Sequence, residues 1–231
     1  MRTKIDSKKK IDLNFKEVIK IFKKNNIHYW LCHGTLLGII RDKRLIPWDH
    51  DVDIAVWNSK KLNLKIRKLI CEKNFILKKK FYKNDGFLTF IRPGGREIDI
   101  NFYNKKKFSD KHIAYVKWYA PKNLLCKLIE ALSAGKNYKG KLSSFIRTFS
   151  FIDFIFIFLK RKLIEKKLFF KGTGYTQPVD LLKNFKTIKF QGISVNIPKR
   201  YNEYLNFVYG KNWKKPIKNF NYRESPSLRD V

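Results

Sequence analysis

Three aspartates at alternate positions are the feature of this sequence with the clearest chemical meaning. Asp49, Asp51 and Asp53 lie in the run IPWDHDVDIAV. In an extended strand alternate side chains share a face, so Asp51 and Asp53 would lie on one side and Val52 and Ile54 on the other. Clustered carboxylates repel one another unless a cation lies between them. The pattern therefore predicts a Mg²⁺ site, because this ion prefers one or two carboxylates together with phosphate oxygens. The alternative is a solvated acidic loop.

A second acidic segment repeats this alternation. In residues 96–103, REIDINFY, the side chains of Glu97, Asp99 and Asn101 would share one face. An Arg-Pro-Gly-Gly turn precedes the segment, which predicts a hairpin with the strand 87–91. A carboxylate on a neighbouring strand would allow two metals, or one metal and a general base, to act on a phosphorus. The alternative is an edge strand with a polar outer face.

A Gly-Thr pair lies directly upstream of the first acids. Residues 27–32 are predicted to form a strand and residues 35–40 the first turns of a helix. Thr35 would then lie near a helix N-terminus, where free backbone N–H groups attract phosphate oxygens. Gly34 would allow a phosphate to approach the backbone closely. An ordinary cap or turn is the alternative for such a pair.

These residues together resemble a known family. The order of a strand, Gly-Thr, a helix, an Asp-x-Asp strand and a later Asp is similar to the nucleotidyltransferase-fold signature. The run HGTLLGIIRDKRLIPWDHDVDI resembles the LicD/fukutin family in particular, and so does the stretch 190–216 with its Tyr-x-x-Tyr-Leu and Tyr-Gly residues. The resemblance brackets the chain from about residue 25 to residue 216, with a poorly matched middle.

The resemblance implies an α/β (α+β) fold, in which a small mixed β-sheet is flanked by helices and followed by a C-terminal helical extension. We expect one domain over residues 1–231. Its core would span about 12–118, its extension about 119–216, and a mobile tail would follow at 217–231.

The resemblance also implies an activity. Family members transfer phosphocholine or a polyol phosphate such as ribitol phosphate from a CDP-activated donor to a sugar hydroxyl, in the biosynthesis of cell-surface glycans or lipopolysaccharide. The expected cofactor is Mg²⁺, with Mn²⁺ as an alternative, and the expected partners are a CDP-alcohol and a glycan or lipid-linked glycan. The resemblance also implies a role for each residue by its position. Asp51 and Asp53 would ligate metal, and Asp99 would ligate metal or accept the proton of the acceptor hydroxyl. The donor phosphates would be bound by Gly34, Thr35 and Arg41, and Asp49 would be an accessory acid.

Two other functions stay open at this point. A nucleotidyltransferase of the same fold would attach a nucleoside monophosphate to a small molecule or an RNA end. A non-catalytic basic protein would bind a membrane or nucleic acid through its surface charge.

The net charge bears on the partner. Lys and Arg number 52 against 19 Asp and Glu, a formal net charge of +33. Such a charge favours a polyanion as the partner. The basic residues are, however, spread along the chain, and compositional drift alone could also produce that distribution. Known nucleic-acid-binding signatures are absent, so we do not favour nucleic acid as a partner.

One segment favours a membrane surface. Residues 145–170, FIRTFSFIDFIFIFLKRKLIEKKLFF, are rich in Phe and Ile, but the uncharged run 154–159 is too short to span a bilayer. The preferred interpretation is a buried helix packed over the sheet. The alternative is a helix lying in the interface of an anionic membrane, which would bring the site near lipid-linked acceptors.

The cysteines, the histidines and the first residues bear on disulfides, zinc binding and localisation. Three isolated cysteines predict no disulfide framework, and four histidines without paired spacing predict no zinc site. The first fifteen residues, MRTKIDSKKKIDLNF, lack the apolar stretch of a signal peptide. We therefore expect a cytoplasmic protein, peripheral on the cytosolic membrane face if 145–170 lies in the interface.

The remaining elements follow from periodicity and turn residues. We expect helices at 12–24, 62–73, 121–132, 145–170 and 199–209, strands at 76–82 and 112–118, a strand pair around 188–195, and a loop at 172–180.

Overall fold

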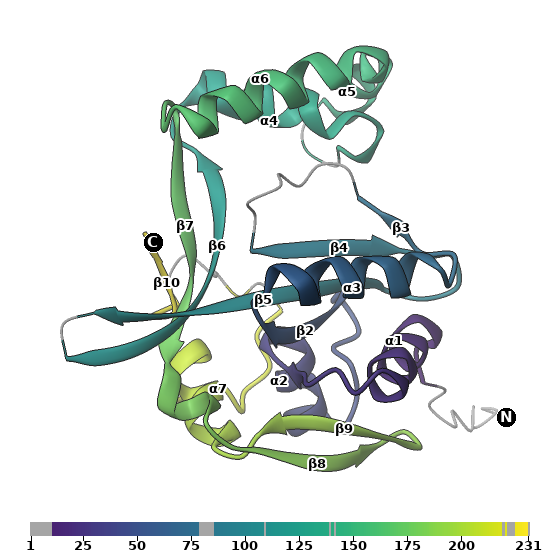
Figure 1. Cartoon of the computed structure of the whole chain (residues 1–231), viewed down its shortest axis with the longest axis vertical. Coiled ribbons are helices and arrows are strands. Elements are labelled where there is room, and N and C mark those ends of the chain that lie inside the picture. Colours follow the sequence, from purple (N-terminus) through teal and green to yellow (C-terminus); the bar gives the residue numbers. More distant parts are fainter. Residues whose placement is uncertain are drawn as a thin grey trace, which may run out of the picture.

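The computed structural model describes residues 11–78, 86–108, 110–138, 140, 142–218, 220 and 225–230 (Figure 1). The helices are α1 Leu13–Lys24, α2 His33–Asp42, α3 Lys60–Cys71, α4 Leu124–Ala134, α5 Ser143–Thr148, α6 Asp153–Glu165 and α7 Tyr201–Tyr209. Short 3-10 turns are η1 Gly135–Asn137, η2 Ser150–Ile152 and η3 Val179–Leu182. The strands are β1 Trp30–Leu31, β2 Asp51–Trp57, β3 Ile76–Leu77, β4 Phe87–Ile91, β5 Glu97–Phe108, β6 Lys111–Pro121, β7 Phe170–Pro178, β8 Phe185–Phe190, β9 Ile193–Pro198 and β10 Leu228–Asp230.

The expected mixed sheet flanked by helices is present. Within the described residues eight strands form one sheet with the path β1-β2-β5-β6-β7-β10, and β4 pairs with β5 and with β3. Strands β2 and β5 are parallel, because α3 and the β3–β4 pair carry the chain between them, whereas the other paired strands are antiparallel. The sheet is larger than predicted because β6 and β7 extend it well beyond the acidic strands.

The apolar faces of the two parallel strands lie at the centre of the core. Val52, Ile54 and Val56 of β2 are fully buried, as are Ile98 and Ile100 of β5. Helices α1 and α3 add their buried faces to the same cluster, chiefly with Phe15, Val18, Phe22, Ile66 and Ile70. Since alternate side chains of a strand point to opposite faces, burial of these residues turns the intervening acids to the other side of the sheet.

The predicted hairpin between 87–91 and the second acidic strand is confirmed, with Thr89 opposite Asp99. The N-cap residue of α1 also bonds the turn before β5. Asp12 caps α1 by accepting from Phe15 N at 2.9 Å, and its second oxygen accepts from Arg96 N at 2.9 Å. The N-terminus of α1 is thereby joined to the start of the second acidic strand.

Residues 172–180, predicted as a loop, form most of β7 and the start of η3, so that prediction is wrong. Two glycines and a proline made the segment resemble a turn by local propensity. Pairing with β6 over nine residue pairs, from Ile113 opposite Pro178 to Pro121 opposite Phe170, overrides that propensity. Tertiary pairing supplies the strand that the local sequence disfavours.

The segment 145–170 is not a buried helix over the sheet. It forms α5, η2, α6 and the start of β7, and six of its large apolar side chains on α5, η2 and α6 are exposed: Phe145, Phe151, Phe154, Ile155, Phe158 and Leu159. Figure 1 shows α4, α5 and α6 apart from the main core, where β6 and β7 lead into them. We call residues 122–169, as far as they are described, the helical lobe. A small second core of Cys126, Ile129, Ile164 and Phe170 holds it together.

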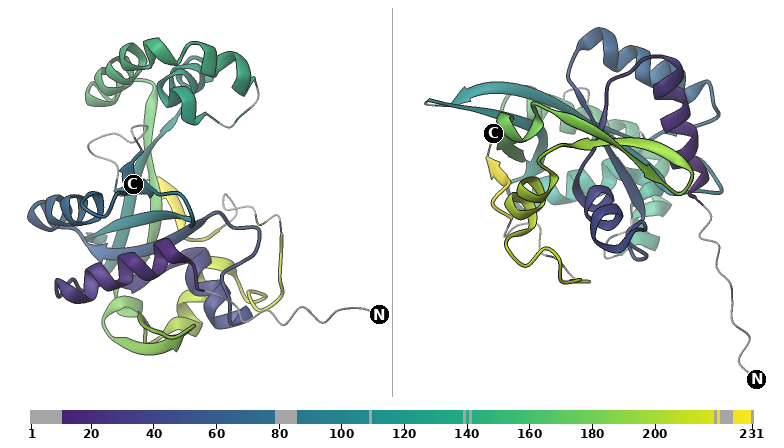
Figure 2. Two further views of the ribbon diagram at one scale, coloured as in Figure 1. Left: turned by 90° about the vertical axis from the view of Figure 1, so that its right-hand side faces the viewer. Right: turned by 90° about the horizontal axis from the view of Figure 1, so that it is seen from below.

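The C-terminal part returns to the main core. The predicted strand pair and final helix are present as β8–β9 and α7, which lie on the side of the sheet away from the helical lobe (Figure 2). Within 217–231, where we expect a mobile tail, residues 228–230 form β10 against β7. The N-terminal residues 1–10 and the second half of the predicted strand 76–82 lie outside the described residues.

No helix in the described ranges has both the length and the apolar character needed to cross a membrane.

Candidate active site

The acids of the two parallel strands meet at one place on the sheet. Asp53 of β2 lies directly opposite Asp99 of β5, and Asp51 lies opposite Glu97. Neighbouring strands are about 4.8 Å apart, so these side chains are close neighbours. A cavity of about 290 Å³ opens over them and is lined by His33, Asp49, Asp51, Asp53, Phe87, Asp99, Asn101, Trp118 and Tyr175. We call it the acidic cavity.

Neighbouring polar groups orient two of the carboxylates. Asn101 Nδ2 donates to Asp53 Oδ1 at 3.3 Å. The Thr89 hydroxyl, from the paired strand β4, donates to Asp99 Oδ1. Each acid therefore has one oxygen fixed by a donor on an adjacent position of the sheet, which is the support that a functional carboxylate needs.

Burial and mutual repulsion alter the protonation of these acids. Burial, and then the charge of Asp49, raise the pKa of Asp51 to about 7. Burial likewise raises the pKa of Asp53 well above its usual value, with further increases from the charges of Asp51 and Asp99. Glu97 is in a different position, because Lys78 forms an ion pair with it. The charge of Glu97 is thus offset by a neighbouring cation.

The aspartates fit a hard divalent cation. Their ligand atoms are all carboxylate oxygens, which suit Mg²⁺ or Mn²⁺, and a cation between them would offset the repulsion that raises their pKa values. Among the described residues, no group of three His, Cys, Asp or Glu side chains is arranged to hold a metal by itself.

An aromatic wall stands beside the acids. Ring centroids are 6.1 Å apart for Phe87 and Trp118, 4.9 Å for Trp118 and Tyr175, and 4.5 Å for Tyr175 and His33. Sequence reasoning missed all four residues. The position of His33 directly before Gly34 was the one local signal, whereas Trp118 and Tyr175 come from β6 and β7, which only the fold brings to the acids.

His33 is a neutral member of this wall. Burial lowers its pKa to about 4, so the imidazole carries no charge at neutral pH. Its Nε2 lies 3.1 Å from the hydroxyl of Tyr103, which is also buried. An uncharged ring held in this way adds no positive charge to offset the acids.

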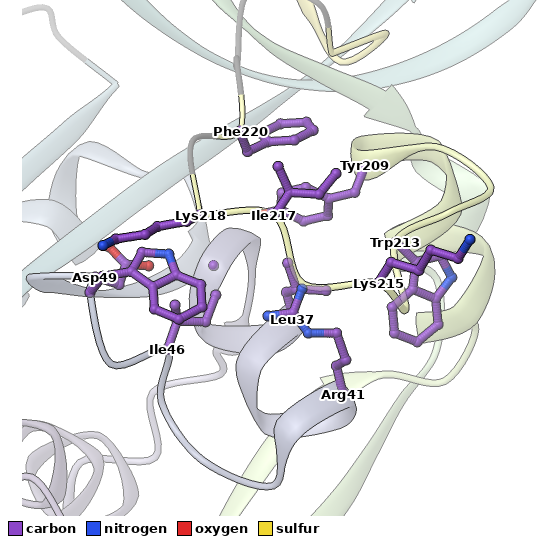
Figure 3. A pocket seen from close by; sticks show the side chains of 12 residues that line it. Leu37, Arg41, Ile46, Asp49, Tyr209, Trp213, Lys215, Ile217, Lys218 and Phe220 are labelled. Atoms are coloured by element: carbon purple, nitrogen blue, oxygen red, sulfur yellow. The ribbon is translucent and has the colours of Figure 1, made fainter.

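A second cavity, of about 220 Å³, adjoins the first at Asp49 (Figure 3). Its basic and aromatic lining comes from the region around α2, from the end of α7 and from the chain after α7: Arg41, Trp48, Tyr209, Trp213, Lys215, Lys218 and Phe220. We call it the basic cavity. It places positive charge next to the border of the acidic cavity.

The three residues predicted to bind donor phosphate lie in different places. Gly34 and Arg41 line the basic cavity, where both guanidinium contacts of Arg41 to Asp42 are short, at 2.7 and 2.8 Å. A side chain at Gly34 would collide with the Asp49 carboxylate, so this glycine makes room for an acid. Thr35 is buried, and its Oγ1 accepts from Asp53 N at 2.8 Å. The Thr35 hydroxyl thus positions the acidic strand.

We expect Thr35→Val to lower the free energy of unfolding by about 1–3 kcal/mol, because it leaves the buried N–H of Asp53 without an acceptor. Valine keeps the shape of threonine, so lost packing contributes little. Urea unfolding measures the change. Thr35→Ser keeps the hydroxyl and should lose less, and equal losses in both variants would contradict this role.

The sequence of this chain is similar to those of several known proteins. Residues 26–138 match the family model described as "LicD/FKTN/FKRP, nucleotidyltransferase domain", and this range contains both acidic strands. An uncharacterized protein of Rickettsia typhi is 30% identical over 116 residues, which are 49% of this chain and 36% of that protein. The human and mouse proteins named ribitol 5-phosphate transferase FKRP are each 40% identical over 40 residues, 17% of this chain and 8% of theirs. The chain thus spans about a third of the Rickettsia relative's length and much less of FKRP.

A solved structure, the lincomycin-bound lincosamide antibiotic adenylyltransferase LnuA, aligns over 82% of this chain and 81% of its own. The sequence identity is 10% and the TM-score is 0.42, a likeness too low to bear on substrate or mechanism.

The acids, the parallel strands that carry them and the family match all fall within one segment, residues 26–138, which matches the nucleotidyltransferase domain of the LicD/FKTN/FKRP family.

Proposed function

We propose that this protein is a Mg²⁺-dependent phosphotransferase that moves a phospho-alcohol from a CDP-activated donor to a sugar hydroxyl during glycan synthesis. The observation that carries the proposal is the pairing of Asp53 with Asp99 on parallel strands, with Asp51 on the same face, inside a family-matched domain. The name of the FKRP relatives supports a phospho-alcohol such as ribitol phosphate, and phosphocholine is the other candidate.

In this reaction the acceptor hydroxyl oxygen forms a bond to the phosphorus that carries the alcohol. The bond from that phosphorus to the bridging oxygen breaks, and CMP leaves with the bonding electrons. Asp51 and Asp53 would hold the metal, which supplies positive charge to the donor diphosphate when bound. Asp99, oriented by Thr89, would take the proton from the acceptor hydroxyl or complete the ligand set.

The two cavities suggest how the donor lies. Lys215 and Lys218 give the basic cavity the charge that phosphate oxygens prefer, and Arg41 lines the same cavity while bonded to Asp42. Asp49 borders both cavities and would lie beside the diphosphate rather than at its reacting phosphorus. The aromatic wall of the acidic cavity leaves a face on which a planar or apolar part of a substrate can pack.

The rival of the same fold is transfer of a nucleoside monophosphate. The description of the matched family as a nucleotidyltransferase domain favours it. A non-catalytic basic protein is less well supported, because such a protein has no need of aspartates gathered over one cavity.

The test is to incubate the protein and Mg²⁺ with CDP-choline, CDP-ribitol and CDP-glycerol, each with a glycan acceptor, and to follow CMP release. Mass spectrometry of the acceptor separates the rivals, because phosphotransfer adds the alcohol phosphate and nucleotidyl transfer adds CMP. We expect alcohol phosphate on the acceptor, and its loss in Asp51→Asn. Glu72→Gln is the matched control, since Glu72 is an exposed acid at the end of α3. Nucleotide on the product would overturn the proposal.

A further inference from the structure

The helical lobe carries most of the exposed apolar surface of this protein. Of the seventeen large hydrophobic side chains exposed in the described residues, twelve belong to this lobe: Leu124, Leu125, Leu128, Leu142, Phe145, Phe151, Phe154, Ile155, Phe158, Leu159, Leu168 and Phe169. Soluble proteins rarely gather exposed apolar side chains in this way without an interaction partner. The lobe's own core is small, so these side chains are not needed to fill it.

Phenylalanines are frequent in α5, η2 and the first half of α6. The ring centroids of Phe145 and Phe149 are 5.0 Å apart, and those of Phe149 and Phe151 are 6.5 Å apart. Phe154 and Phe158, four residues apart, share a face of α6, and their side chains are 64% and 60% exposed. These five residues are the phenylalanine surface.

Positive charge accompanies this surface. Residues 122–169 contain eleven Lys and Arg and three Asp and Glu. Lys162 extends over the ring of Phe158, with its Nζ 5.6 Å from the ring centroid. One lysine of the lobe, Lys160, is buried and paired with Glu130, whereas Arg161, Lys162, Lys166 and Lys167 are exposed. Exposed phenylalanines beside exposed lysines are typical of helices that lie in the interface of an anionic membrane.

We infer that the helical lobe docks on an anionic lipid bilayer, with the phenylalanine surface in the interface and the neighbouring Lys and Arg on the lipid headgroups. The net charge favours an anionic bilayer over a second copy of the chain as the partner of this surface. Two copies of a lobe with so large an excess of positive charge would repel each other, as would two chains of net charge +33, whereas an anionic bilayer attracts both.

The docked lobe would set the distance of the active site from the membrane. Trp118 and Tyr175 of the aromatic wall are on β6 and β7, the two strands that lead into the lobe (Figure 2). Trp118 is three residues from the end of β6 and Tyr175 five from the start of β7. At about 3.3 Å per residue these spans are roughly 10 and 17 Å. This inference deepens the proposed function, because an acceptor carried on a lipid would then lie within reach.

The experiment is co-sedimentation of the full chain with vesicles of phosphatidylcholine alone and with about 30% phosphatidylglycerol. We expect binding to the anionic vesicles, weakened by added salt, and little binding to the neutral ones. The double variant Phe154→Ser/Phe158→Ser should bind about tenfold or more weakly, because it removes two rings from the interface. Phe145→Ser, at a side chain that is 62% exposed, should weaken binding in the same direction.

Leu64→Ser/Ile76→Ser is the matched control, since both side chains are about equally exposed, at 61% and 63%, but lie outside the lobe. It should bind as the wild type does. Equal binding by the double variant and the wild type would overturn the inference. A second result would also overturn it: the wild type forms a dimer in analytical ultracentrifugation and does not bind vesicles, and the double variant is a monomer.

Asp53→Asn separates this inference from the proposed function. That variant should bind vesicles like the wild type whether or not the protein transfers a phospho-alcohol. Its loss of vesicle binding would overturn membrane docking by the lobe.

Discussion

Asp53→Asn is expected to reduce the rate of transfer on the order of 10³-fold, close to 4 kcal/mol of transition-state stabilisation. Asp53 lies at the centre of the acidic face, opposite Asp99, with Asn101 bonded to its carboxylate and Thr35 to its backbone N–H. Asparagine has the same shape but cannot supply a negative oxygen to a cation. The initial rate of CMP release at saturating Mg²⁺ measures the effect.

The loss should not come from unfolding. Replacing a buried, repelled carboxylate by a neutral amide relieves the repulsion from Asp51 and Asp99, so thermal stability should be unchanged or higher. Asp180→Asn is the control, because Asp180 is an exposed acid that pairs with Lys183 away from the cavity. A variant Asp53→Asn that keeps more than about a tenth of the wild-type rate would contradict the assignment.

Asp51→Asn is expected to stabilise the metal-free protein at pH 8 and to remove most of the stabilisation that Mg²⁺ gives. The pKa of Asp51 is about 7 in the folded protein, against 3.8 for an ordinary aspartate. Because the pKa of Asp51 is higher in the folded state than in the unfolded state, its contribution to stability is fully present below the unfolded pKa. That contribution is lost as the pH rises through 7, the folded pKa. Ionised Asp51 therefore destabilises the fold at pH 8, and asparagine cannot ionise.

The expected gain is on the order of 2 kcal/mol after allowance for solvent screening, or roughly 4–8 °C in Tm for a domain of this size. Thermal unfolding in EDTA at pH 5 and pH 8 measures it, and the difference between variant and wild type isolates this one group. Added Mg²⁺ should raise the Tm of the wild type more than that of the variant, since a ligand stabilises the state that binds it. An equal difference at both pH values would contradict the assigned pKa.

Much of the site could be predicted because its signals are local. The alternation of Asp51 and Asp53 with Val52 and Ile54 assigns both faces of β2 from the sequence alone, since a strand has a fixed period of two. The turn before Glu97 likewise predicted the hairpin that carries Asp99. The pairing of β2 with β5 was not predictable in its register, because a crossover of two strands and a helix lies between them.

Three features depended on contacts between distant parts of the chain. Strand β7 forms in a segment with glycines because β6 provides its pairing partner. Trp118 and Tyr175 reach the acids only because β6 and β7 join the same sheet. The side chain of Thr35 accepts a hydrogen bond from the backbone of Asp53, which lies on another element.

The sequence by itself determined which face of each acidic strand carries carboxylates and which is apolar, because strand periodicity is a property of short segments. Only the tertiary structure decided that Asp53 lies opposite Asp99, that an aromatic wall stands beside them, and that four phenylalanines between 145 and 158 are exposed. An apolar side chain is the same residue in the sequence whether it lies in a core or on a surface. Their burial depends on what the rest of the chain packs against them.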